Sequence, residues 1–374
     1  MVRCRDLLVL LFLVLASAAC TDNAQSPTST AADESPAPAW HSMAEGPLGP
    51  RFGHTAIWTG EEMVIWGGVG PQEEIADGAS YDPRSDEWVR LPRSPIGPRF
   101  GHTAIWTGEE MLVWGGEGRE GKLLSDGAAY NPTTETWRRI RRSPLGGRFG
   151  HSAVWTGEEM VIWRGTSAEG PFADGAAYDP LRDRWRAIAK ARLGPRFGHS
   201  AVWTGEEMVI WRASNAGGPF ADGGAYDPRK DSWRPVAEGP LTRRADHVAV
   251  WSDAEMVVWG GTGPEGALDD GAAYDPTRNS WRSLAPAPIA GRVVSSAVWT
   301  GAEMVVWGGT GPHGLAANGA AYDPAADAWR EVPPGPLTAR YGHTAAWTGE
   351  EMLIWGGDTA AGLAGDGAAF RPDR

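Results

Sequence analysis

The apolar residues of this 374-residue chain fall in short continuous runs rather than in strict alternation with polar ones. In the first unit of the pattern, the runs 54–58 (HTAIW) and 63–66 (MVIW) flank the polar turn 59–62 (TGEE). Runs of this length between turn residues are typical of short strands that are buried on both faces. Shorter apolar stretches at 79–81 and around Trp88 follow, separated by Gly-Gly and Asp-Pro turn signals. The pattern therefore predicts four short strands in each unit.

Tryptophan shows that this unit is repeated. The tryptophans of the fourth strand lie 49, 48, 48, 48 and 48 residues apart, and Trp40 lies 48 residues before the first of them: Trp88, Trp137, Trp185, Trp233, Trp281 and Trp329. Two parallel ladders mark the first and second strands: Trp58, Trp106, Trp155, Trp203, Trp251, Trp299, Trp347 and Trp66, Trp114, Trp163, Trp211, Trp259, Trp307, Trp355. The three ladders use all 21 tryptophans. Seven copies of about 48 residues predict an all-β, seven-bladed β-propeller with four antiparallel strands per blade.

The two ends of the repeat complement each other. The last copy stops at 370–372 without a fourth strand, whereas the chain has an orphan fourth strand at its beginning. Trp40 precedes Arg51 by 11 residues, just as Trp329 precedes Arg340 by 11. We therefore expect the N-terminal strand to complete the last blade as its outer strand and to close the ring without a covalent bond.

The residues before the repeat predict export from the cytoplasm. Two arginines precede the apolar run 7–15, and small residues then lead to Cys20. The predicted organisation is a signal peptide at 1–19, a flexible tether at 20–39 and the propeller at 40–374. The small residues before Cys20 resemble a bacterial lipobox, which would make Cys20 a site of lipid attachment; simple secretion is the alternative. Because Cys4 and Cys20 are the only cysteines, the propeller has no disulfide or thiol nucleophile.

Four motifs recur in most units: Arg-x-Gly-His before the first strand, a double glycine after the second, Tyr-Asp-Pro after the third, and the later Trp. With these motifs, the chain resembles the kelch family, including the central domain of galactose oxidase, over about residues 40–372. It departs from the family pattern at two double glycines, which read Arg164-Gly165 and Arg212-Ala213. The resemblance implies that the first strand of each blade is the innermost one.

The recurrent polar residues place candidate chemistry on one face of the predicted ring. Every blade has an arginine, and six blades have a histidine and an aspartate: Arg51, Arg99, Arg148, Arg196, Arg244, Arg292, Arg340; His54, His102, His151, His199, His247, His343; Asp77, Asp126, Asp174, Asp222, Asp270, Asp366. The sixth blade has Ser295 for histidine and Asn318 for aspartate, so the two change together. This paired change predicts a His–Asp hydrogen bond inside each blade. The arginines either belong to that structural network or form a mouth that attracts carboxylates or sulfates.

Blades three and four differ most from the others. Their double glycine begins with arginine, and their next loops share the string GPFADG. The candidate ligand-binding residues on these blades are Arg164, Arg212, Phe172, Phe220, Arg148, Arg196, His151 and His199. Two extra cations and two aromatic rings would form a local patch for an anion or a sugar. The alternative is that one blade arose by duplication of its neighbour, because the two copies are nearly identical.

Composition and motifs limit the function classes. A net charge of −13 with no basic run argues against a nucleic-acid partner and against membrane binding by charge, so a membrane would be reached only through a lipid anchor. Copper-radical chemistry needs a cysteine that the propeller lacks, and no metal or cofactor motif is present, so we expect no cofactor. Short loops favour a non-catalytic, monomeric binding or scaffold propeller outside the cytoplasm, presenting an arginine-bearing face to a protein or glycan. The alternative is a carbohydrate-active enzyme resembling kelch-type sialic acid mutarotases.

Overall fold

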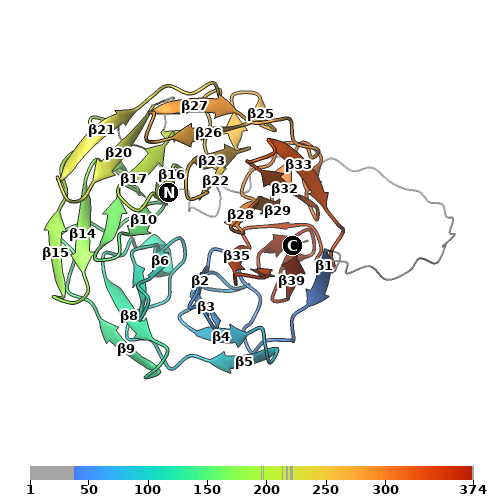
Figure 1. Cartoon of the computed structure of the whole chain (residues 1–374). Helices are drawn as coiled ribbons and strands as arrows, with labels where there is room; N and C mark the ends of the chain where they lie inside the picture. Colours follow the sequence, from blue (N-terminus) through green and yellow to red (C-terminus); the bar gives the residue numbers. More distant parts are fainter. Residues whose placement is uncertain are drawn as a thin grey trace, which may run out of the picture.

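Seven four-stranded antiparallel sheets surround one axis in the computed structural model, which describes residues 38–194, 196, 198–212, 214–215, 218–219 and 222–372 (Figure 1). The predicted signal peptide, Cys20 and nearly all of the predicted tether lie outside the described residues. Among the residues that are described, no helix is long and apolar enough to cross a membrane. The seven sheets are the predicted blades, and their strands are named a to d from the axis outward.

In the first six blades the four strands follow one another in sequence, whereas the last blade takes its strand d from the N-terminal end of the propeller. The innermost strands a are β2 (Thr55–Trp58), β6 (Thr103–Trp106), β10 (Ser152–Trp155), β16 (Ser200–Trp203), β22 (Val248–Trp251), β28 (Ser296–Trp299) and β35 (Thr344–Trp347). Strands b are β3 (Met63–Trp66), β7 (Met111–Trp114), β11 (Met160–Trp163), β17 (Met208–Trp211), β23 (Met256–Trp259), β29 (Met304–Trp307) and β36 (Met352–Trp355). Each strand a contacts the strands a of both neighbouring blades, and β2 contacts β35, so the ring is closed.

The outer half of each blade is a second antiparallel pair. Strands c are β4 (Gly78–Asp82), β8 (Gly127–Asn131), β14 (Gly175–Asp179), β20 (Gly223–Asp227), β26 (Gly271–Asp275), β32 (Gly319–Asp323) and β39 (Gly367–Arg371). Strands d are β5 (Glu87–Arg90), β9 (Thr136–Arg139), β15 (Arg184–Ala187), β21 (Ser232–Val236), β27 (Ser280–Ser283), β33 (Ala328–Val332) and β1 (Ala39–Ser42).

The connections define two faces of the ring. The b–c loops and the linkers from strand d to the next strand a lie on one side, which we call the b–c face; the a–b and c–d turns lie on the other, the a–b face. Short elements on the b–c face are η1 (Arg119–Gly121), β12 (Thr166–Ser167), β13 (Gly170–Pro171), β18 (Ser214–Asn215), β19 (Gly218–Pro219), β24 (Thr262–Gly263), β25 (Gly266–Ala267), β30 (Thr310–Gly311), β31 (Gly314–Leu315), β34 (Arg340–Tyr341), β37 (Asp358–Thr359) and β38 (Gly362–Leu363).

The core lies between blades, which explains why strand b has no polar alternation. Each strand b packs against one neighbouring blade with one face and against the other neighbouring blade with its second face. The residues of Met63–Trp66 are accordingly at most 1% exposed. The indole of Trp66 contacts Trp137 of the next blade, with ring centroids 5.8 Å apart. Equivalent pairs, with centroids 4.8–5.9 Å apart, occur at all seven junctions: Trp66–Trp137, Trp114–Trp185, Trp163–Trp233, Trp211–Trp281, Trp259–Trp329, Trp307–Trp40 and Trp355–Trp88. The b and d tryptophan ladders therefore join the blades to one another.

The N-terminal strand closes the ring as the sequence predicts. Strand β1 pairs antiparallel with β39 of the last blade, with Trp40 opposite Phe370 (Figure 1, blue against red). The two rings lie 5.0 Å apart, and the indole N–H of Trp40 donates to the carbonyl of Pro333 at 2.8 Å. The first and last segments of the propeller thus share one blade.

Loss of this closing strand should destabilise the whole ring. Deletion of residues 40–46 removes the outer strand of the last blade and should lower the melting temperature sharply. Trp40→Ala alone should cost about 3–5 kcal/mol of unfolding free energy, because it leaves a large cavity. The matched control is Val89→Ala, whose side chain on another outer strand is 55% exposed and whose loss should change stability by less than about 0.5 kcal/mol. Calorimetry on the three variants tests the closure, and an unchanged melt of the deletion variant would refute it.

Candidate functional site

The arginine that precedes strand a is buried beneath the b–c loop of its own blade. In the second blade, Arg99 donates to the carbonyls of Gly97 and Gly115 and to a carboxylate oxygen of Asp126 at 2.9 Å. The seven arginines are at most 7% exposed, and six of them at most 1%. Their aspartate partners are 44–60% exposed. The expected arginine-lined mouth is therefore wrong, because the guanidinium groups point inward to satisfy loop carbonyls and the carboxylates face the solvent.

The expected His–Asp hydrogen bond inside each blade is also wrong. The aspartate pairs with the arginine instead, and in the sixth blade Arg292 donates to the amide oxygen of Asn318 at 2.7 Å. The aspartate-to-asparagine change thus replaces an ion pair with a hydrogen bond from the same charged arginine to a neutral acceptor.

Each histidine joins its blade to the preceding one. Nε2 of His102 lies 2.9 Å from Oγ1 of Thr55, the first residue of the neighbouring strand a. Six junctions have this contact at 2.8–2.9 Å: His54–Thr344, His102–Thr55, His151–Thr103, His199–Ser152, His247–Ser200 and His343–Ser296. The imidazole also meets the edge of Trp66, with centroids 5.2 Å apart. Gly67 leaves room for it, because a Cβ there would lie 2.7 Å from Cε1 of His102.

At the junction between the fifth and sixth blades, both members of this histidine contact are replaced. Ser295 replaces the histidine, and the partner position on the preceding strand a is Val248 rather than threonine or serine. The residue that changes together with the histidine is thus Val248, and the simultaneous Asn318 change belongs to the arginine contact. The Thr/Ser ladder at the start of strand a was the sequence signal that could have identified this pair.

Burial keeps these histidines neutral. Desolvation, followed by the nearby arginine of the same motif, lowers the pKa of five of them to about 3: His54, His151, His199, His247 and His343. The pKa of His102 also lies well below its usual value for the same reasons. Neutral imidazoles that already bond a hydroxyl serve the packing of blades, not acid–base chemistry at physiological pH.

The two additional arginines of blades three and four fasten each blade to the next. Arg164 and Arg212 adopt positive φ values of 57° and 51°, where the other blades have glycine, and are at most 1% exposed. Arg164 donates to the carbonyls of Leu193 and Gly194 in the following linker, and Arg212 to that of Leu241. Each guanidinium also lies over the tryptophan that precedes it, 4.3 and 4.2 Å from the ring centroid. Burial, together with the arginine of the next blade, lowers the pKa of both to about 10.

The other candidates on these blades are also engaged within the protein. The guanidinium of Arg148 lies 4.0 Å from the ring centroid of Phe172 and pairs with Asp174. Arg196 pairs with Asp222 at 2.8 Å. His151 and His199 make the junction contacts described above, and Phe220 lies outside the described residues. The structure thus groups most of the predicted patch but directs its cations to backbone carbonyls and aspartates rather than to solvent.

A different asymmetric surface lies at the axis of the b–c face. Among the described residues, a half-buried aromatic side chain follows the motif arginine in four blades; we call these side chains the aromatic collar: Phe52, Phe100, Phe149 and Tyr341. Phe100 packs over Gly53 of the preceding blade, and Phe149 over Gly101 in the same way. Blades five and six interrupt the collar, with Ala245 and Val293 at the aromatic position.

The following residue is glycine in five blades, whereas blades five and six have Asp246 and Val294. Val294 holds a φ of 54°, which is strained for a β-branched residue and costs about 1–3 kcal/mol. The carboxylate of Asp246 lies over Gly198. Its side chain is open to solvent at the axis, yet the surrounding blades desolvate it and raise the pKa of its carboxyl. Strain and an isolated carboxylate at the same place are typical of binding sites.

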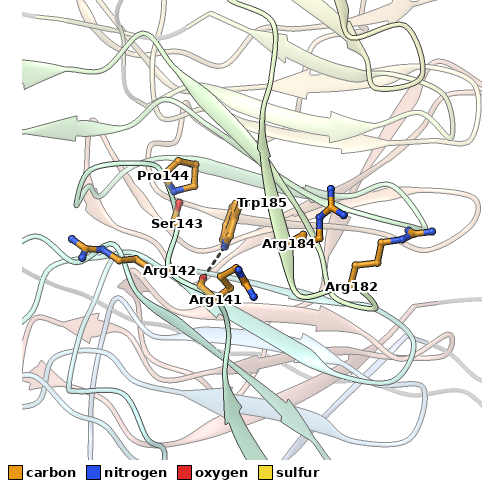
Figure 2. A pocket seen from close by; sticks show the side chains of 7 residues that line it. All are labelled: Arg141, Arg142, Ser143, Pro144, Arg182, Arg184 and Trp185. Carbon is orange, nitrogen blue, oxygen red and sulfur yellow. Dashed lines mark hydrogen bonds between the residues drawn. The ribbon is translucent and has the colours of Figure 1, made fainter.

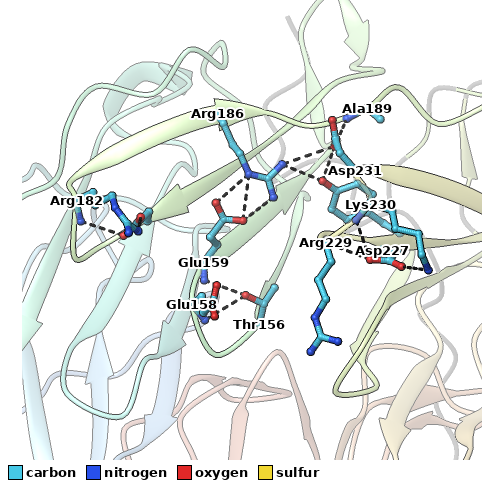
Figure 3. Close-up of polar contacts among 12 residues, drawn as sticks. Thr156, Glu158, Glu159, Arg182, Arg186, Ala189, Asp227, Arg229, Lys230 and Asp231 are labelled. Atoms are coloured by element: carbon cyan, nitrogen blue, oxygen red, sulfur yellow. Dashed lines mark hydrogen bonds and ion pairs between the residues drawn. The ribbon is translucent and has the colours of Figure 1, made fainter.

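The a–b face carries a second network that the sequence reasoning missed. Arg186 of strand d binds Glu159 of its own blade (Figure 3). It also donates to the hydroxyl of Tyr226 in the next blade at 3.1 Å. That hydroxyl donates to Asp231 at 2.6 Å, and the carboxylate also accepts the backbone N–H of Ala189. The signal was an arginine directly after the d tryptophan in five blades: Arg138, Arg186, Arg234, Arg282 and Arg330. These groups too are engaged between blades.

Among the described residues, no group of three or more potential metal ligands is found. The repeated titratable groups have equivalent partners from blade to blade, whereas acid–base catalysis needs two groups in unlike environments. The arrangement is suited to binding at the axis.

Two overlapping segments, residues 53–238 and 150–357, match the family model of the KLHDC2/KLHL20/DRC7 Kelch-repeats domain. No curated protein matches the chain.

Restoring the missing histidine contact should show pairwise coupling. Ser295→His alone should destabilise the ring by about 1–3 kcal/mol, because Val248 leaves the buried imidazole without a partner. Adding Val248→Thr should recover stability, with a coupling energy of about 0.5–3 kcal/mol in urea unfolding. Purely additive effects would show that the hydroxyl contact does not join the blades.

The buried histidines should make the fold sensitive to acid. The pKa of His343 is about 3 in the folded state and about 6.5 in the unfolded state, so between these two pH values only the unfolded chain takes up its proton. Each histidine therefore lowers stability by up to about 1.4 kcal/mol per pH unit as the pH falls. In His343→Gln, urea unfolding between about pH 5 and 6.5 should show a slope smaller by about one proton. A slope in His343→Gln equal to that of the unmodified protein would contradict the assignment.

Proposed function

The chain belongs to the kelch-repeat family, and on that premise we propose that it is a non-catalytic binding propeller that works outside the cytoplasmic membrane. The leader supports export, and the residues before Cys20 support a lipid anchor at that cysteine. We further propose a monomer, since the closing strand completes the fold within one chain.

The axial part of the b–c face is the proposed partner site. It combines the half-buried aromatic collar, the isolated carboxylate of Asp246 and an outer ring of half-exposed aspartates. This conjunction is the observation that carries the proposal, because apolar rings at the centre and charge around them are the usual anatomy of a protein interface. The acidic ring replaces the arginine-bearing surface of the initial hypothesis.

The exposed carboxylates and aromatic rings of the b–c face indicate which kind of partner would bind there. Carboxylates that are about half exposed retain affinity for cations although an arginine lies beneath them. The aromatic collar adds apolar contact area at the axis. We therefore propose a protein segment with basic and apolar side chains as the partner, and a glycan that stacks on the collar as the second candidate.

The alternative of a carbohydrate-active enzyme has little support. It relied on an exposed arginine to hold a sugar carboxylate, but the motif arginines are at most 7% exposed and face backbone carbonyls and side-chain acceptors of their own blade. Asp246 is one acidic group, and sugar chemistry of the usual kind needs a pair.

Peptide and glycan arrays on the purified protein would test the proposed function. Extended peptides with basic and apolar residues should bind, with affinity that falls as salt rises. Asp246→Lys with Phe100→Ser should weaken binding about tenfold or more, through repulsion and lost apolar contact. The matched control on the a–b face is Glu158→Lys with Leu181→Ser, both exposed side chains, and it should bind as the unmodified protein does.

Binding of glycans but not peptides would make the second candidate correct. Equal affinity of the axial and control variants would refute the axial site. Acceleration of sugar anomerisation by the protein, followed by NMR, would contradict the non-catalytic proposal.

A further inference from the structure

An open groove of about 490 Å³ lies at the outer edge of the ring, between the second and third blades (Figure 2). One wall is the linker 141–144, which runs from the second blade to the third. The other wall comes from Arg182, Arg184 and Trp185, at the c–d turn and outer strand β15 of the third blade. The groove is separate from the axial site, because strand d is the strand farthest from the axis.

Four arginines line this groove: Arg141, Arg142, Arg182 and Arg184. All four are exposed, and Figure 2 shows their side chains spreading around the indole of Trp185. Arg182 pairs with Asp179 at 2.7 Å, and Arg141 lies 3.9 Å from Asp183. Arg142 and Arg184 form no ion pair within the described part of the chain. The guanidinium groups of Arg142 and Arg184 are therefore available to a ligand. Those of Arg182 and Arg141 are held only by solvent-exposed ion pairs, which water weakens.

The repeated architecture does not require these arginines. The indole N–H of Trp185 donates to the backbone carbonyl of Arg141 at 2.8 Å, and other d tryptophans make the same bond to the linker before them. The backbone N–H of Arg141 donates to Asp183 as Ala44 donates to Asp86. Both contacts use backbone atoms of residue 141, so its side chain is free to vary.

The equivalent junctions show that the charge is specific to this one. At the positions that correspond to these four arginines, each of the other junctions with a described c–d turn has at most two basic residues. In the order of Arg141, Arg142, Arg182 and Arg184, the residues at these junctions are Pro92, Arg93, Thr134, Thr136; Ala189, Lys190, Lys230, Ser232; Ala237, Glu238, Arg278, Ser280; Ala285, Pro286, Ala326, Ala328; and Ala44, Glu45, Ser85, Glu87. The last set carries two glutamates. Four cations in one groove of a chain with net charge −13 are thus a local reversal of sign.

We propose that this groove binds an extended, acidic segment of a partner protein. Guanidinium groups are planar and donate in pairs, which suits carboxylates, and several of them along one groove suit several carboxylates in succession. Strand β15 is the outer strand of its sheet, so one side of its backbone is unpaired and can accept an extended chain alongside it. A groove of this size accommodates a few residues of such a chain. The inference does not depend on the axial site.

Fluorescence anisotropy with a short, labelled oligoglutamate peptide would test this site on the full chain. The peptide should bind at low salt and dissociate as salt rises. Arg142→Glu with Arg184→Glu should weaken binding about tenfold or more, because neither side chain gives up an ion pair with another described residue. The milder pair Arg142→Gln with Arg184→Gln should weaken it less, and unchanged melting temperatures would show that both variants fold.

The chain supplies a control with the same change of net charge. Arg84→Glu with Arg93→Glu alters two exposed arginines that form no ion pair among the described residues, and Arg93 occupies the position that corresponds to Arg142. This control should retain binding within about twofold. Equal loss in both double variants, or no binding of the peptide at low salt, would overturn the proposed site.

Three further measurements distinguish a protein segment from other molecules that could occupy the groove. Oligogalacturonate carries carboxylates on a sugar backbone, and vesicles with anionic lipids carry phosphates on a membrane. Tighter binding of either one, lost in Arg142→Glu with Arg184→Glu, would overturn the assignment to a protein segment. Sedimentation that shows self-association, again lost in that variant, would make a second copy of this chain the occupant and would overturn it too.

Discussion

The contact between two indoles across each blade junction is the interaction on which the ring depends. A tryptophan of strand b meets a tryptophan of strand d in the next blade, and the seventh contact uses Trp40 to join the two ends of the propeller. Each buried indole removes about 150–250 Å² from water, which gives about 4–6 kcal/mol as an upper bound. The propeller has no cysteine, so packing of this kind must provide the stability that a disulfide would otherwise add.

This reliance on junctions explains where the polar residues go. The recurrent arginines, histidines, glutamates and tyrosines satisfy one another, or backbone carbonyls, both within their own blade and across the junctions to adjacent blades. Residues repeated seven times are thereby committed to the fold. Recognition is left to positions where the copies differ, such as Asp246 at the axis and the arginines beside Trp185 at the edge.

Much of the fold could be predicted from the sequence, and little of the site. The tryptophan spacing gave seven blades of four strands, and the offset between Trp40 and Arg51 gave the closing strand and its blade. The direction of each side chain was not in the pattern, because a ladder identifies equivalent positions but not whether they face a neighbour or the solvent. Arg164 illustrates this: it looked like an exposed cation, yet a positive φ turns it into the following linker. The partner of each histidine was missed because it lies 47 or 48 residues away, or across the closure, in another blade.

The seven junctions, although built from one repeat, are mechanically unequal. Those after the third and fourth blades have an additional arginine fastened to the next linker, whereas the one between the fifth and sixth lacks the imidazole–hydroxyl bond and borders a strained valine. We therefore expect local opening of the ring to be easiest at the junction between the fifth and sixth blades. Asp246 lies beside this junction. We therefore expect the ring to deform most easily at this part of its axis, where a bound segment could enter while β1 and β39 stay paired.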